Sequence, residues 1–247
     1  MKLFPFLLLL TSFICGCGQP TTPKSASGSV KDAPEISKMN PNDILFSLPS
    51  LNDALPTELG AAAAGDDCYR MHEDNWRQFE FVEAAFEPEI ASEIEHIDRI
   101  WVEQSVPLGD IGTAFRNLHI RKRIPKPLNI ALSIAEFEKL FGQPISPITF
   151  IDYQKVLSDV HAVRLKNVII YGRFERDRLT TLGIEPMDRF VIAGDVADRL
   201  ERFVTEHDLR LIHWPSRTRF ESTATAMSYL RGKGKAVADG DATATVR

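Results

Sequence analysis

Carboxylates, histidines and cationic side chains that lie close together in this sequence are its candidates for chemistry. Asp159-Val160-His161 places an aspartate and a histidine two residues apart, so on a strand their side chains would share a face. The carboxylate could then orient the imidazole as a general base, although the sequence places no nucleophile beside them. A surface pair at the end of a strand is the alternative interpretation.

A second group lies in the segment 66–74, which reads DDCYRMHED. It brings a thiol, an imidazole and four carboxylates together, and Cys68, His72 and Asp74 are its candidate ligands for a divalent cation. Their spacing fits no tetrahedral template. The alternative is a solvated acidic loop with the cysteine packed inward. We therefore predict no metal and no other cofactor, and keep these three residues as the candidates should a metal bind.

The segment 115–127 (FRNLHIRKRIPKP) is a cationic stripe in a chain whose net charge is −5. Its apolar residues Leu118 and Ile120 are expected to face inward on a strand. Three cationic side chains would then point outward together: His119, Arg121 and Arg123. They could bind a phosphate or carboxylate ligand, or an acidic partner. Alternatively, these charges protect an exposed edge strand from aggregation.

Familiar catalytic motifs are absent from the sequence. It contains no HExxH, paired CxxC, GxSxG, GxxxxGK[ST] or GxGxxG, and no two of its six histidines lie three or four residues apart. A catalytic triad assembled from distant residues would leave no such motif. The pI near 5.7 shows no basic excess, which argues against nucleic acid as a partner.

The hydrophobic patterns predict an α+β fold: a mixed, largely antiparallel sheet packed by about three helices in a single compact domain. Strands are predicted at 76–82, 115–123, 128–132, 147–153, 164–174, 189–193 and 209–214. Helices are predicted at 89–103, at 134–141 after a capping box formed by Ser133 and Glu136, and from Asp195 to Val204.

Both ends of the chain are small and polar. Residues 17–42 are rich in Pro, Ser, Thr, Gly and Lys, and such a stretch buries too little apolar surface to offset its conformational entropy. We therefore expect a flexible tether at 17–42, the globular domain at 43–220 and a disordered tail at 221–247.

The first seventeen residues have the pattern of an export signal that ends in a cysteine. Lys2 is followed by about a dozen mostly apolar residues, too few for a transmembrane helix. The sequence Ile14-Cys15-Gly16-Cys17 then resembles the lipobox of bacterial lipoproteins. The resemblance implies that residues 1–16 are removed and that Cys17 becomes the lipidated first residue. Ordinary secretion, with the whole segment removed, is the alternative.

Together these features predict a lipid-anchored protein of the bacterial cell envelope, held to a membrane and facing the periplasm or the exterior. Its domain would be a binding or structural module: an adaptor, a sensor of an anionic ligand or an immunity-type inhibitor. The expected partners are the membrane, through the lipid, and a protein or anionic envelope ligand. The alternative is an envelope hydrolase with a dispersed site, for which Asp159, His161, His119 and Arg121 are the candidates.

Replacement of the lipobox cysteine tests the anchor. Cys17→Ser should leave an uncleaved precursor that incorporates no labelled palmitate, because the thiol is the acceptor of the lipid. Cys15→Ser is the matched control and should be labelled and processed normally. Mobility on a gel and fatty-acid labelling measure both outcomes, and normal processing of Cys17→Ser would contradict the lipobox assignment.

Overall fold

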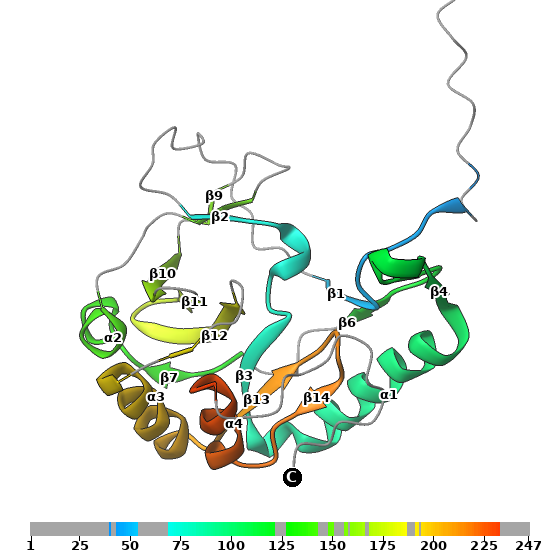
Figure 1. Cartoon of the computed structure of the whole chain (residues 1–247). Helices are drawn as coiled ribbons and strands as arrows, with labels where there is room; N and C mark the ends of the chain where they lie inside the picture. The colour runs from blue at the N-terminus through cyan, green and yellow to red at the C-terminus, as the bar shows by residue number, and fades with distance from the viewer. Residues whose placement is uncertain are drawn as a thin grey trace, which may run out of the picture. The chain divides into compact units, whose positions relative to one another are not determined.

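Seven strands form an antiparallel sheet at the centre of this computed structural model (Figure 1). Their order is β10 (Val160–Leu165), β11 (Val168–Phe174), β12 (Arg178–Pro186), β3 (Phe79–Glu83), β13 (Leu209–His213) and β14 (Thr218–Arg219), with β7 (Ile130–Ala131) beside β12. The structure describes Asn40 and residues 43–53, 69–121, 127–142, 148–150, 156–157, 159–165, 168–186, 191–192 and 194–232.

Smaller sheets and helices complete the described part of the chain. β1 (Ser50–Asn52) pairs in parallel with β6 (His119–Arg121), β4 (Ser105–Pro107) pairs with β5 (Thr113–Phe115), and β8 (Ile148–Phe150) lies between β2 (Tyr69–Met71) and β9 (Val156–Leu157). The α-helices are α1 (Glu87–Gln104), α2 (Ile134–Phe141), α3 (Gly194–Glu206) and α4 (Thr223–Leu230), with 3-10 turns η2 (Glu73–Asn75), η3 (Ala84–Phe86) and η4 (Gly109–Ile111). The predicted α+β class, with a largely antiparallel sheet in a single domain, is confirmed.

Both faces of the central sheet are covered by other elements. On one face, helices α2, α3 and α4 pack against Phe79 and Phe81 of β3. On the other face, Val82 of β3 packs in a cluster with Ile90 and Ile97 of α1. Figure 1 shows α2, α3 and α4 grouped together, while α1 runs beside β13 and β14. Residues of β2 and β8 join a third cluster with β10 and β11.

Both faces of β3 are buried, although the alternation of apolar and polar residues in the predicted strand 76–82 indicates one face in water. Phe79 and Phe81 do face the core, but Glu80 on the opposite face is 1% exposed and Gln78 is 5% exposed. An alternation of apolar and polar residues is typical of a strand with one face in water. The local sequence carries no sign that α1 covers the second face. Glu80 is thus a charged residue in the protein interior.

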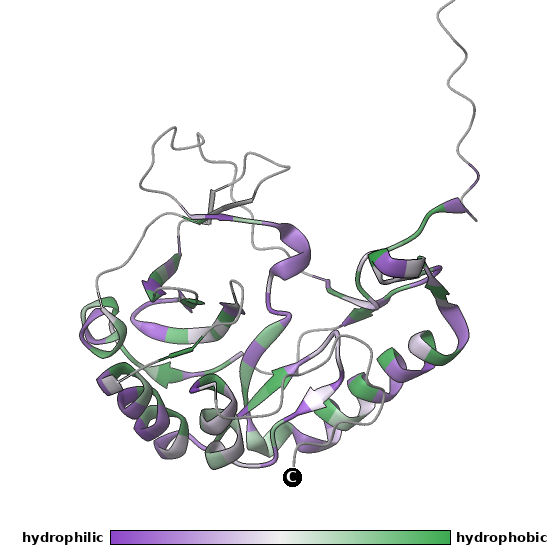
Figure 2. Cartoon of the chain, in the orientation of Figure 1, coloured by the Kyte–Doolittle hydropathy of each residue, from purple (hydrophilic) through white to green (hydrophobic). Residues whose placement is uncertain are grey.

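The helices begin where their local signals predict. Ile90 and Ile97 lie two turns apart on the buried side of α1. At the start of α2, Ser133 Oγ accepts a hydrogen bond from the backbone N–H of Glu136, and Glu136 Oε2 accepts one from the backbone N–H of Ser133 at 2.8 Å. Figure 2 shows hydrophobic and hydrophilic residues alternating along α1 and α3, as expected for helices with one buried face.

Several strand predictions need correction. The predicted strand 164–174 covers the end of β10 and the whole of β11, which are separate strands, and the sequence pattern predicts no strand where β12 lies. Residues 168–172 are all buried, so this run lacks the period of two that marks a half-buried strand. In the predicted strand 189–193, Val191 and Ile192 are not in a strand, and the other three residues lie outside the described residues.

The predicted disordered tail is also corrected, because residues 223–230 form α4. Ala226, Met227 and Leu230 are buried in the largest hydrophobic cluster, beside α3. Ser222 caps the helix through a hydrogen bond from the backbone N–H of Thr225. The segment is rich in small polar residues, and its few apolar side chains are enough because they meet an existing core. Residues 233–247 lie outside the described residues.

The N-terminal predictions concern residues that the structure does not describe. The predicted signal peptide, Cys17 and nearly all of the predicted tether lie outside the described residues. Within the described residues, no helix combines the length and the apolar character that a membrane crossing requires.

Shortening a buried side chain of α4 tests the correction of the tail. Met227→Ala should lower the free energy of unfolding by about 2–5 kcal/mol, because it removes a fully buried side chain and leaves a cavity. Ser228→Ala, on the same helix but outside the core cluster, is the matched control and should change stability little. Urea unfolding measures both, and equal midpoints would show that α4 is not part of the folded core.

Candidate functional site

The buried carboxylate of Glu80 is held by three side chains. Its Oε2 accepts a hydrogen bond from Arg77 Nε at 2.6 Å, and its Oε1 accepts one from Trp214 Nε1 at 2.9 Å. Arg121 Nη1 lies 3.5 Å from the same Oε1, and the Arg121 guanidinium lies 4.6 Å from the centre of the Trp214 ring. A buried carboxylate requires such partners, because an isolated charge in the interior is very costly. This group of residues joins β3, β6 and the end of β13.

The predicted orientation of the cationic stripe is therefore reversed. Arg121 is 4% exposed, whereas Ile120 is 57% exposed. Side chains two residues apart do share a face, as predicted. The polar face of β6 points inward, because Arg121 pairs with the buried Glu80. Burial lowers the pKa of Arg121 to about 10 despite the opposing effect of Glu80, so the guanidinium stays charged at neutral pH. Arg121 is thus committed to Glu80 and does not offer a surface for an anionic ligand; Arg123 lies outside the described residues.

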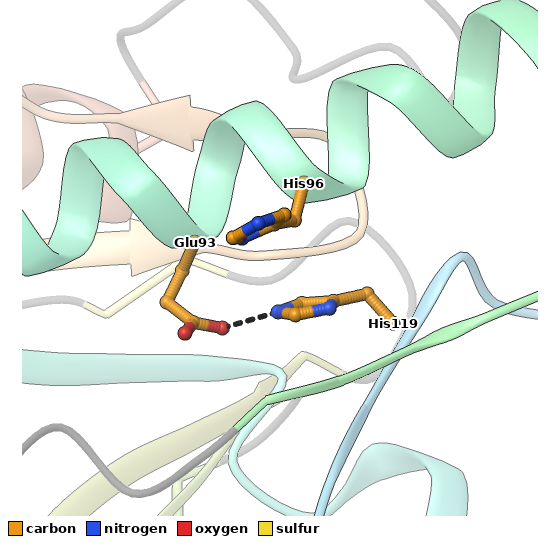
Figure 3. Close-up of side chains that lie close together, drawn as sticks. All are labelled: Glu93, His96 and His119. Atoms are coloured by element: carbon orange, nitrogen blue, oxygen red, sulfur yellow. Dashed lines mark hydrogen bonds and ion pairs between the residues drawn. The ribbon is translucent and has the colours of Figure 1, made fainter.

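The same reversal turns His119 toward α1, where it meets two other potential metal ligands (Figure 3). Glu93 and His96 are three residues apart on α1, so both project from one side of the helix. His119 Nε2 lies 2.6 Å from Glu93 Oε2. The rings of His96 and His119 are stacked, with centroids 4.7 Å apart.

These three half-buried residues could hold a metal ion. One potential ligand atom from each lies within 4.8 Å of the others, and no other three histidine, cysteine or acidic residues of the described chain are placed in this way. A pair of histidines on one helix does not mark this group in the sequence, because its two histidines lie on separate elements, α1 and β6. The usable signal was Glu-x-x-His at residues 93–96, but the third member, His119, comes from a separate strand.

The candidate metal ligands of the acidic segment make other contacts in the structure. His72 caps η2 by accepting a hydrogen bond from the backbone N–H of Asp74 at Nδ1, and Asp74 Oδ2 accepts a hydrogen bond from Ser47 Oγ at 2.8 Å. His72 and Asp74 thus fasten a turn to the segment before β1. Cys68 lies outside the described residues.

The predicted catalytic pair does not form a dyad in the structure. Asp159 Oδ2 accepts a hydrogen bond from Arg173 Nε at 2.6 Å, on the neighbouring strand β11. His161 packs edge-on against Phe174, and burial lowers the pKa of His161. The aspartate therefore pairs across two strands instead of orienting the imidazole.

A different histidine lies beside a serine. His213 Nδ1 is 2.5 Å from Ser216 Oγ, and His213 shares a pocket of about 140 Å³ with Glu185. Glu185, however, accepts hydrogen bonds from Tyr69 and Asn75. Burial lowers the pKa of His213 to about 4, and no carboxylate of the described residues bonds to it. Since a triad needs a carboxylate that stabilises the imidazolium, this pair is better suited to holding the turn after β13.

A second pocket of about 270 Å³ lies between the end of α1 and the turn after β13. Trp101 forms one wall, where it donates a hydrogen bond to the carbonyl of Pro215 at 3.0 Å and meets Phe115 edge-on. The Arg217 guanidinium lies 4.4 Å from the centre of the Trp101 ring and pairs with Asp98 of α1. These contacts fix the wall from two sides, so the pocket has a defined shape.

Removal of the charge on Glu80 tests its role. Glu80→Gln should lower the free energy of unfolding by about 3–5 kcal/mol, because Arg77 and Arg121 would lose their buried counter-charge. Arg121→Met should lower the free energy of unfolding by less, because Arg77 and Glu80 would remain as an ion pair with no net charge. Glu95→Gln, exposed on α1, is the matched control and should stay within about 0.5 kcal/mol of wild type in urea unfolding. A Glu80 variant as stable as the control would contradict this assignment.

Comparison of the chain with protein-family models, with curated proteins and with solved structures finds no match. The function of the chain must therefore be inferred from the geometry of its own residues.

Proposed function

We propose that this chain is a lipid-anchored protein of the bacterial cell envelope whose domain docks a protein partner. The docking surface is the Trp101 pocket together with the exposed apolar side chains next to it. The pocket is lined by Ser47, Leu48, Pro49, Trp101, Ile111, Gly112, Thr113, Phe115, Pro215 and Ser216.

The distribution of exposed apolar side chains carries this proposal. Seven large hydrophobic residues of the described chain are exposed, and six of them belong to segments that pack around α1 and its neighbouring small sheets. These six are Ile44, Leu45, Val102, Leu108, Ile111 and Ile120, and the seventh is Val191. Val102 and Ile111 are 83% and 88% exposed. Single exposed apolar residues are ordinary, but a concentration of them in neighbouring segments is typical of an interaction surface.

The lining of the pocket indicates the chemistry of the partner. It contains no ionisable side chain, so it offers no positive charge to a phosphate or carboxylate. Together with the burial of Arg121, this favours a protein partner over an anionic ligand at this surface. Trp101, Phe115 and two prolines provide apolar walls, and three hydroxyl groups lie among them. A volume of about 270 Å³ suits one or two apolar side chains of a protein partner, framed by a few hydrogen bonds.

The anchor proposed from Cys17 gives this docking surface its setting. A chain of about 25 residues rich in Pro, Gly and Ser spans a root-mean-square distance of roughly 28 Å. The domain would therefore stand clear of the bilayer and meet other envelope proteins, which suits an adaptor or an immunity-type inhibitor. The hydrolase alternative has less support, since Asp159 pairs with Arg173 and no described site joins a nucleophile, a base and a carboxylate.

Site-specific photo-crosslinking in intact cells tests the docking surface. A photoreactive amino acid at Ile111 or Val102 should give a discrete protein adduct, because both side chains are exposed, Ile111 lines the pocket and Val102 follows Trp101 on α1. The same amino acid at Arg202 or Thr205, exposed on α3, is the matched control and should give none. With the probe at Ile111, Val102→Glu should lower the adduct yield by about tenfold or more, as loss of a contact at an interface predicts.

Two outcomes would contradict the proposal. Equal adducts at the α3 positions would show that the crosslinks reflect crowding and not a defined surface. Adducts with lipid in place of protein would mean that this apolar region faces the membrane.

A further inference from the structure

We propose that Glu93, His96 and His119 form a binding site for one divalent transition-metal ion, with zinc as the ion that suits them best. The ligands would be two imidazole nitrogens and one carboxylate oxygen. This inference rests on the geometry in Figure 3 and is independent of the docking surface.

Two rigid elements place the three ligands. Glu93 and His96 are fixed one turn apart on α1, a helix of 18 residues. His119 is fixed on β6 by its parallel pairing with β1, where Ser50 faces His119 in the register. Arg121 lies two residues after His119 on β6, so the two side chains share a face. Because Arg121 pairs with the buried Glu80, this face points inward. The site therefore does not depend on a flexible loop.

The distances allow an ion to enter with small side-chain movements. Ligand distances of about 2.0–2.2 Å place two ligand atoms of one zinc ion roughly 3.3 Å apart. The three potential ligand atoms already lie within 4.8 Å of one another, and Glu93 Oε2 lies 2.6 Å from His119 Nε2. An ion would replace this hydrogen bond and bring the His96 ring into contact with the same centre.

The state of His96 adds a second observation. Its Nδ1 is buried and has no hydrogen-bond partner within the described residues. Buried polar atoms are nearly always paired, and an imidazole nitrogen without a partner is an exception that calls for an explanation. A metal ion coordinated by this nitrogen would explain it. So would a water molecule bonded to Nδ1 while the other ring nitrogen coordinates the ion.

The ligand set selects the class of metal. Calcium takes six to eight oxygen ligands and magnesium prefers oxygen in an octahedral arrangement, which one carboxylate cannot provide. Imidazole suits zinc, copper, nickel and iron. With three protein ligands the ion would keep an open position for water or an external ligand. The positive charge of Arg121 close to Glu93 is expected to moderate the affinity.

An ion at this position would link α1 to β6, and through β6 to β1. These elements carry or adjoin the docking surface, since Trp101 and Val102 lie on the last turn of α1. Metal occupancy should therefore raise the melting temperature, because a ligand that binds only the folded state stabilises it.

Calorimetric titration of the full chain tests the site. Metal-free protein carrying Cys68→Ser, purified in detergent, is titrated with zinc chloride; this background removes a thiol that could bind zinc elsewhere. We expect one ion per chain. His119→Asn and Glu93→Gln should each weaken binding by about tenfold or more, since each removes a ligand. His72→Asn, which alters the other histidine–carboxylate pair, is the matched control and should bind zinc as the background does.

A second measurement keeps the test decisive if a variant fails to fold. Cobalt(II) added to the unaltered site should give the intense visible absorption of a low-coordinate nitrogen and oxygen environment, and zinc should abolish it. The proposal is overturned if the background protein takes up no zinc, or if the cobalt spectrum matches that of the hydrated ion. It is equally overturned if folded His119→Asn and Glu93→Gln variants bind zinc as tightly as the control.

Discussion

The burial of one carboxylate, Glu80, is the constraint on which the rest of this structure depends. Because α1 covers the second face of the sheet, Glu80 cannot reach water and has to be satisfied inside the protein. Arg77, Arg121 and Trp214 provide this, and they come from three separate parts of the chain. The carboxylate thus joins the sheet, β6 and the turn after β13. A group of buried charges is satisfied in few arrangements, so it fixes the position of each element. Apolar packing alone would allow the elements to shift relative to one another.

The orientation of β6 follows from that interaction, and the proposed metal site follows from the orientation. With Arg121 inward, the period of two places His119 inward as well, below Glu93 and His96 of α1. The same alternation exposes Ile120. The middle of α1 therefore carries two potential metal ligands, while its last turn carries Trp101 and the exposed Val102. A metal site and a docking surface on one helix are compatible, because they use different residues and different turns.

Sequence reasoning succeeded where structure depends on near neighbours. The capping box of Ser133 and Glu136 started α2 as predicted, and the apolar spacing along α1 placed its buried side correctly. It failed where burial comes from distant elements. β12 and the separation of β10 from β11 were missed, because strands buried on both faces lose their alternation. α4 was missed because its few apolar residues matter only against a core that already exists.

The amino-acid pattern alone was enough to predict the fold class, the start of α2 and which residues of a strand share a face. It also contains the lipobox pattern at Cys17, which stays a prediction. These features depend on interactions between residues at most a few positions apart, such as caps and periodic side-chain directions. Which face of β6 points inward could not be predicted, because it depends on a contact with Glu80, 41 residues before Arg121. The candidate metal site could not be predicted for the same reason: His119 meets Glu93, 26 residues away, only after α1 has packed beside β6.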